Sequence, residues 1–279
     1  MINTRGEDIM DHMTLLREFL QFPLDNADGI FTKFASLERA VTAQGQNPLE
    51  RFVYIPGTRK DRVLLVAHAD TVWDAAYGNP QETTPILDGH IFRSSNPTCG
   101  IGADDRAGCA MVWALRNSGH SLLIVHGEEK GKHGARFLRK AYAKLYRELN
   151  RHQYMMEMDW AGFGGCLYNQ VDNTPAFKAY ITETLGFTDS QAKGGCDLQI
   201  LCHKVCGVNV STGWNHCHRP TETLDCDQWL QNYEALERFL EKPQPRYPIA
   251  RISRMKRFAG KVKGKLGALA RKLHLRPAK

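Results

Sequence analysis

A short apolar run that ends in a histidine and an aspartate constrains the fold of this chain more than any other feature. Residues 63–67 are apolar and include β-branched side chains, so they predict a buried strand. His68 and Asp70 follow directly at its carboxyl end. Ligands of open α/β sheets bind in the crevice beyond the carboxyl ends of strands. The pair marks a candidate site, although a strand-end histidine beside a turn-forming aspartate would explain it equally well.

Acidic residues recur where other predicted core segments end. Residues 121–126 and 154–158 predict two more buried strands, and a glycine-containing loop precedes a predicted helix over 109–115. The carboxylates at these places are Asp104, Asp105, Glu128, Glu129 and Asp159. At one sheet edge, each pair about 4 Å apart would repel by roughly 4 kcal/mol at an effective dielectric near 20. A cation would relieve this, and His with Asp and Glu is the ligand set of zinc, with manganese or cobalt as alternatives.

The remaining periodicities predict further strands and helices along the chain. Apolar residues at helical spacing predict helices over residues 9–20, 31–41, 135–149 and 233–240. Strand-like runs occur at residues 52–55, 91–93 and 177–181. A Pro-Gly turn after the first run predicts a hairpin with residues 63–67.

Length and composition indicate one generous α/β domain or two small ones. Of the 279 residues 42% are hydrophobic, and no apolar run approaches the roughly 18 to 20 residues that a membrane helix needs. The first residues lack the basic-then-apolar pattern of a secretion signal. Eight cysteines without such a signal are typical of free thiols in a reducing compartment. We therefore expect a soluble, cytoplasmic protein.

The net charge of +7 is concentrated at the C-terminal end. Residues 242–279 contain 13 Lys and Arg and no Asp or Glu, so the rest of the chain carries 7 − 13 = −6. Bulk charge therefore does not indicate a nucleic-acid-binding body. We divide the chain into a body of residues 1–242 and a basic tail of residues 243–279.

The tail combines an apolar stripe with basic residues. Its apolar residues at helical spacing are Ile252, Met255, Phe258, Val262, Leu266, Leu269 and Leu273. This pattern is typical of amphipathic helices on membrane surfaces or acidic partners. Three glycines weaken the helix by up to about 1 kcal/mol each, which favours ordering on contact. Contact with a membrane or nucleic acid, docking on the acidic body or a protein partner, and a solvated tail stay open.

Taken in order, the motifs resemble those of the co-catalytic di-zinc exopeptidases, the superfamily of peptidase T, aminoacylase and the single-domain zinc aminopeptidases. They are His68-x-Asp70-Thr71, Gly102-Ala103-Asp104-Asp105-Arg106-Ala107-Gly108, Glu128-Glu129, Asp159, and His218 with Glu222. About 60 residues separate Asp159 from His218, too few for the dimerisation domain that some branches insert there. The resemblance implies a single-domain, three-layer α/β/α fold over residues 1–242, with a mixed, mostly parallel sheet and no inserted domain.

The resemblance also implies two zinc ions and a role for each motif residue. Asp70 would orient the His68 ring, and Glu128 would be the general base toward a bridging metal-bound water. The implied activity is hydrolysis of amide bonds in small peptides or N-acyl amino acids by a metallopeptidase, an exopeptidase of the aminopeptidase type. The implied metal ligands are His68, Asp105, Glu129, Asp159 and His218, with Asp105 bridging both ions.

Several alternatives remain. His216 also follows Asn215, although the spacing of His218 to Glu222 fits the family pattern better. Residues 194–197 form either a substrate-side turn, as the family's Gly-Ser/Thr-Asp segment does, or a plain turn. An inactive relative that acts as a binding module is the alternative function. A further alternative is a structural zinc site, although the spacing of its ligands departs from the paired Cys-x-x-Cys pattern. Its ligands would be Cys202, Cys206, His216 and Cys217.

Overall fold

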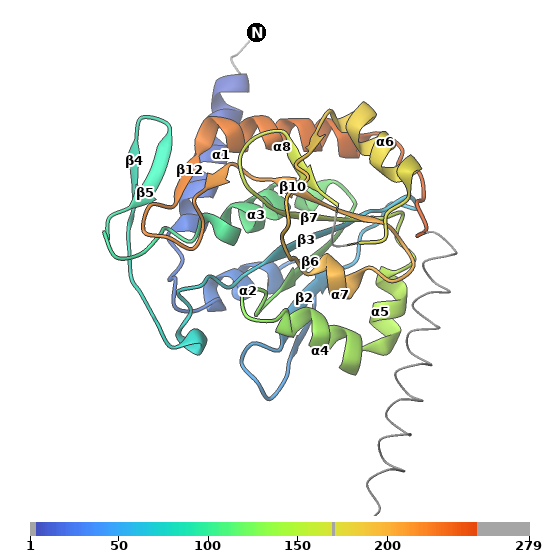
Figure 1. Cartoon of the computed structure of the whole chain (residues 1–279), viewed down its shortest axis with the longest axis horizontal. Helices are drawn as coiled ribbons and strands as arrows, with labels where there is room; N and C mark the ends of the chain where they lie inside the picture. The colour runs from blue at the N-terminus through green and yellow to red at the C-terminus, as the bar shows by residue number, and fades with distance from the viewer. Residues whose placement is uncertain (1–3, 169–170, 250–279) are drawn as a thin grey trace, which may run out of the picture.

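A twisted eight-stranded sheet forms the centre of the molecule (Figure 1). The structure is a computed structural model that describes residues 4–168 and 171–249. The sheet order is β1-β2-β6-β3-β7-β10-β8-β9. Four central strands run parallel to one another: β6 (Ser121–Val125), β3 (Leu64–His68), β7 (Met155–Trp160) and β10 (Gly207–Ser211). The outer strands are β1 (Val41–Gln44), β2 (Arg51–Ile55), β8 (Gly165–Leu167) and β9 (Thr188–Asp189).

Helices cover both faces of the sheet because its strands send alternate apolar side chains to opposite sides. Leu65 packs into one buried cluster and Leu64 into the other. The first cluster lies under α1 (Thr4–Leu20), α2 (Asp28–Ala35), α3 (Ala103–Ala114), α6 (Pro175–Leu185) and α8 (Cys226–Glu241). The second lies under α4 (His133–Ala141), α5 (Ala143–Leu149) and α7 (Leu198–Leu201). The expected single-domain three-layer α/β/α fold with a mixed sheet is confirmed.

A second, four-stranded sheet stands beside the first (Figure 1). Its order is β11-β12-β5-β4, and all its pairings are antiparallel. The loop between β11 and β12 carries His218, so this sheet positions the late histidine of the motif series. Its strands are β4 (Pro85–Asp88), β5 (Ile91–Ser94), β11 (Trp214–Asn215) and β12 (Thr223–Asp225), and short 3-10 helices span Ala75–Tyr77 and Leu115–Asn117.

The predicted hairpin of residues 52–55 and 63–67 is wrong. β6 lies between β2 and β3, and it pairs antiparallel with the first and parallel with the second. All three strands are largely buried, so their side chains give no sign of which strand pairs with which. The turn after β2 therefore could not reveal that β6, more than 50 residues after β3, lies between β2 and β3.

Three other predicted elements have different types or bounds. The predicted strand 177–181 is part of helix α6, because Thr174 caps the helix and Phe177 and Ile181 lie four residues apart on one buried face. The predicted helix 31–41 ends at Ala35, and Val41 begins strand β1. The predicted helix 135–149 is divided at Tyr142 into α4 and α5.

The segment 243–249, which the sequence analysis assigned to the basic tail, packs against the body. Gln244 accepts hydrogen bonds from the hydroxyls of Tyr154 (2.6 Å) and Tyr180 (3.0 Å), and Ile249 is buried. The backbone N–H of Cys206 donates to the carbonyl of Tyr247 (2.8 Å). These contacts favour a domain boundary after Ile249. Residues 250–279, with the proposed amphipathic helix, lie outside the described residues.

No helix in the described ranges combines the length and the apolar character that crossing a membrane requires.

Two truncations test this boundary. A chain that ends at Ile249 retains all the contacts above, so we expect its urea midpoint to match that of the full chain. A chain that ends at Lys242 loses buried Ile249 and leaves the Tyr154 hydroxyl without Gln244, which we expect to cost at least about 3 kcal/mol. Equal midpoints for the two truncations would place the boundary back at residue 242.

Buried His152 makes stability depend on pH. Its ring bonds the Leu149 carbonyl (2.9 Å) and the Ser121 hydroxyl (2.8 Å), and burial lowers its pKa to about 4. The neutral ring stabilises the fold above pH 6.5, and this contribution is lost as the pH falls toward 4. Between pH 7.5 and pH 4, we expect the unfolding free energy to fall by about 3 kcal/mol more in the wild type than in His152→Gln, measured by urea titration. Equal losses in the two proteins would contradict this role.

Candidate metal centre

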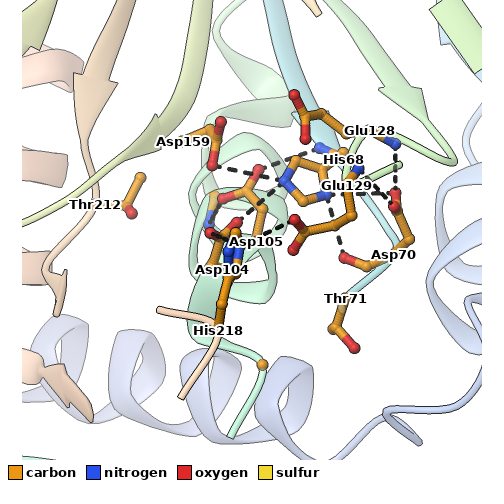
Figure 2. Close-up of polar contacts among 12 residues, drawn as sticks. His68, Asp70, Thr71, Asp104, Asp105, Glu128, Glu129, Asp159, Thr212 and His218 are labelled. Carbon is orange, nitrogen blue, oxygen red and sulfur yellow. Dashed lines mark hydrogen bonds and ion pairs between the residues drawn. The ribbon is translucent and has the colours of Figure 1, made fainter. Parts of the chain in front are cut away.

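His68 and Asp159 meet at the carboxyl ends of adjacent parallel strands. His68 ends β3, and Asp159 lies in β7, which pairs with β3. The His68 Nε2 atom lies 3.1 Å from Asp104 Oδ1 and 3.6 Å from Asp159 Oδ1 (Figure 2). Asn209 on β10 holds Asp159 at two points: its side-chain oxygen accepts the Asp159 backbone N–H (2.9 Å), and its side-chain NH2 donates to the Asp159 carboxylate (3.3 Å). Three elements of the central sheet and the start of α3 therefore form one half of the site.

His218 forms the other half from the β11–β12 loop. Its Nε2 atom lies 3.1 Å from Asp104 Oδ2 and 2.9 Å from Glu129 Oε2. The Asp104 carboxylate thus lies between two histidines, with one oxygen toward His68 and the other toward His218 (Figure 2). Three of the predicted ligands, His68, Glu129 and His218, therefore surround Asp104, for which no role was predicted.

Asp105, the predicted bridging residue, lies on the His68 and Asp159 side of the site and does not contact His218 in the described part of the chain. Its carboxylate is buried and accepts the backbone N–H groups of His68 (3.1 Å) and Gly108 (3.1 Å). It also lies near Asp159 and His68, within a group that could hold an ion. The geometry makes Asp104, rather than Asp105, the carboxylate shared by the two histidines. Two adjacent aspartates look alike in the sequence, so the sequence could not show which side chain points toward both histidines. The backbone torsions at the start of α3 decide this.

Asp70 anchors the acidic turn that follows β6. Its Oδ1 atom accepts the backbone N–H groups of Gly127 (2.8 Å) and Glu128 (3.2 Å), and its Oδ2 atom accepts that of Glu129 (3.2 Å). The Tyr77 hydroxyl also donates to Oδ2 at 2.5 Å. Gly127 adopts a φ of 75° in this turn, a left-handed conformation that glycine tolerates.

Asp70 also contacts the ring of His68, as the motif implies. The His68 Nδ1 atom lies 3.4 Å from Asp70 Oδ1 and 3.2 Å from the Asp70 carbonyl oxygen. One buried carboxylate therefore connects the ring at the end of β3 to the two glutamates after β6. Tyr77 had not been singled out in the sequence, because nothing local marks a tyrosine in a 3-10 turn as a partner of Asp70.

Glu222 holds the loop before Asp104. Its carboxylate accepts the backbone N–H groups of Gly102 (2.7 Å) and Asp104 (3.1 Å).

Burial, together with the charge of Asp104, raises the pKa of Glu222 to about 8. Burial and the Asp104 charge likewise raise the pKa of Glu129 to about 7. Hydrogen bonds to Asp104 and Glu129 raise the pKa of His218 to about 11. Burial and crowding thus disfavour the charged forms of the Glu129 and Glu222 carboxylates.

The side chains fit two metal ions that share Asp104. Asp104 belongs to two groups of possible ligands: ligand atoms of His68, Asp104 and Glu129 lie within 4.8 Å of one another, as do those of Asp104, Cys217 and His218. The Glu129 side chain is 4% exposed, and within the described ranges its Oε1 atom has no hydrogen-bond partner. An unsatisfied buried carboxylate oxygen beside imidazoles suits zinc, which takes nitrogen and oxygen donors.

Glu128 lies beside this cluster and is not part of it. Figure 2 shows its carboxylate pointing away from His218, toward which Glu129 points. The Lys132 Nζ atom lies 2.7 Å from Glu128 Oε1, and both side chains are largely buried. Lys132 was not singled out in the sequence, where a lysine near a helix start is most simply a solvated residue.

The segment 194–197 lies behind Glu128. Buried Glu157 accepts the backbone N–H groups of Asp197 (3.2 Å) and Leu198 (3.1 Å) at the start of α7. Burial and the neighbouring charges of Glu157 and Glu128 raise the pKa of Asp197. The turn also approaches Lys132, because a Cβ atom at Gly195 would lie 3.2 Å from Nζ. Whether this turn contacts substrate stays a prediction.

The alternative ligand sets find little support in the geometry. His216 and His218 are both exposed, but it is His218 that reaches Asp104 and Glu129. In the described part of the chain, no metal-capable group includes Cys202, Cys206 or His216. Cys217 instead joins Asp104 and His218 in a group of possible ligands.

Comparison with known proteins supports the fold. No protein-family model matches the chain, and no protein of curated function matches it. Solved structures do match. The aminopeptidase PepT from Bacillus cereus (14% identity, TM-score 0.62) and a tripeptidase from Staphylococcus aureus (13%, 0.62) each align over 84% of this chain and 98% of their own. An aminopeptidase from the archaeon Desulfurococcus kamchatkensis (12%, 0.59) aligns over 85% and 96%. The chain thus has the fold of these peptidases.

The two adjacent aspartates make a matched pair of variants. We expect Asp104→Asn to reduce bound zinc from about two ions per chain to below one, because it weakens a donor to both ions. Asp105→Asn keeps one of the two oxygens that accept the His68 and Gly108 backbone N–H groups and leaves the Asp104 carboxylate in place, so it should keep most of the metal. Mass spectrometry of metal content, with circular dichroism to verify folding, measures both. The reverse order of losses would restore Asp105 as the shared ligand.

Proposed function

We propose that this protein is a zinc-dependent hydrolase of amide bonds in small peptides or N-acyl amino acids, acting as an exopeptidase of the aminopeptidase type. One observation carries the proposal: the Asp104 carboxylate is shared by His68 and His218 beside Glu128, at the carboxyl ends of the central strands. Similar solved structures bear the names aminopeptidase and tripeptidase, which supports this substrate class.

In this proposal the chain holds two zinc ions, with manganese or cobalt as possible substitutes. His68, Asp104 and Asp159 would hold one ion, and Asp104, Glu129 and His218 the other. When bound, the ions supply a Lewis acid that polarises the scissile carbonyl and makes water a better nucleophile. Asp70 keeps the His68 ring and the Glu128–Glu129 turn in place through the hydrogen bonds described above.

Glu128 is the proposed general base. Its carboxylate would take a proton from the attacking water and return it to the leaving amine, so the residue ends the reaction unchanged. The Lys132 ammonium forms an ion pair with this carboxylate, 2.7 Å from Oε1. Neighbouring glutamates can divide the work because they point in different directions beyond the strand end (Figure 2).

The same ion pair favours a second candidate function. If Lys132 occupies the Glu128 carboxylate permanently, no base is available, and the protein would be a metal-binding module without turnover. The basic residues of the 250–279 segment would then contact a membrane surface or nucleic acid as the main function. Eight free cysteines support a reducing, cytoplasmic location in either case.

Replacing Glu128 by Gln separates catalysis from metal binding. We expect Glu128→Gln to retain about two zinc ions while kcat on dipeptides falls by roughly 10²- to 10⁴-fold, because the amide cannot accept the proton. Glu129→Gln is the matched control and should lose metal as well as activity. Wild-type turnover in Glu128→Gln would refute the assigned base. A zinc-loaded wild type that hydrolyses no dipeptide, tripeptide or N-acyl amino acid would support the binding module.

A further inference from the structure

The β11–β12 loop brings a thiol to the proposed second ion site. Cys217 directly precedes His218, and its Sγ atom lies within 4.8 Å of the nearest Asp104 oxygen and His218 ring nitrogen, which themselves lie as close together. These are two of the three side chains that would hold the second ion. The third, Glu129, has a buried Oε1 atom with no hydrogen-bond partner in the described part of the chain. Glu129 and the thiol thus share their neighbours: His218 Nε2 lies 2.9 Å from Glu129 Oε2, and Asp104 and His218 both lie beside the Cys217 sulfur.

The loop adopts an unusual backbone conformation around the thiol. His216 and His218 have φ values of 56° and 63°, in the left-handed region that L-residues other than glycine rarely adopt. Antiparallel pairing of Trp214 with Leu224 closes the loop on both sides. Residues held in this way occur often at ligand sites, where the surrounding structure maintains the costly conformation.

Cys217 also differs from the other cysteines in exposure. All eight cysteines are free, and seven of them are buried, whereas Cys217 is half-buried. A buried cysteine usually acts as a small apolar side chain in the core. Cys217 instead lies among carboxylates and an imidazole, where the apolar role does not apply.

We propose that Cys217 is an additional ligand of the second ion, which it binds as a thiolate together with Asp104, Glu129 and His218. This inference rests on the proposed two-ion site. On binding, the thiol proton is released to solvent, since the thiolate is the ligand. The second ion then has four protein ligands, as closed zinc sites do, whereas the first has three and keeps an open position. Substrate would therefore engage the first ion, at His68.

A thiolate donor has two chemical consequences. Soft sulfur favours zinc over harder cations such as manganese, so the second ion site becomes selective for zinc. The same sulfur makes the metal-free protein sensitive to thiol reagents, because this thiol is the accessible one of the eight. Bound metal would protect it.

Cobalt is the probe that tests the bond. Metal-free protein is loaded with Co²⁺ under reducing conditions, and the bound cobalt is counted by mass spectrometry. We expect the wild type and the control Cys226→Ala to show near-ultraviolet thiolate-to-cobalt charge-transfer absorption, and Cys217→Ser to lose it while still binding at least one ion. Absorption that persists in Cys217→Ser, or is absent from fully loaded wild type, overturns the inference and leaves the proposed function intact. A wild type that binds no metal overturns both.

Thiol titration gives a second readout. In native metal-free protein, we expect the half-buried thiol to react with an aromatic disulfide before the seven buried thiols do, and Zn²⁺ to slow that reaction at least tenfold. Cys217→Ser should lose this first reaction and Cys226→Ala should retain it. A rate that zinc does not change, in protein shown to contain zinc, contradicts ligation by Cys217.

Discussion

The Asp104 carboxylate, placed between His68 and His218, is the contact on which the organisation of the site depends. It joins three segments far apart in sequence: the end of β3, the start of α3 and the β11–β12 loop. Glu222 fixes the backbone of the Asp104 loop, and Asp70 fixes the turn that presents Glu129. The backbone N–H groups of Asp104 and Glu129 are thus each held by the carboxylate of another buried acid.

Crowded carboxylates make this arrangement costly in the absence of a cation. Burial raises the pKa values of Glu129 and Glu222, and the charge of Asp104 adds to both shifts. The neighbouring carboxylates likewise raise the pKa values of His68 and His218, because they favour the charged rings. Buried charges are expensive unless they are paired or coordinate a metal. A fold that gathers so many acids around two imidazoles is most simply explained by divalent ions that displace these protons.

Much of the fold could be predicted from the sequence, because the core strands are strongly apolar and several helices have apolar residues at helical spacing. Strands β3, β6 and β7 and the acidic residues at their ends follow from local patterns. The hairpin prediction failed because strand order depends on long-range packing: β6 inserts between β2 and β3. The strand expected at 177–181 is helix α6, since two apolar residues four apart also suit a helix.

The sequence by itself determined the chemical composition of the site: which histidines and acids end the core strands, and that together they suit zinc. Only the tertiary structure decided which of two adjacent aspartates is shared between the histidines. Backbone torsions at the start of α3 send neighbouring side chains in different directions, and Glu222, 118 residues away, holds the first of them in place. The position of Cys217 beside Asp104 was decided in the same way, by a loop whose ends are held in a distant sheet.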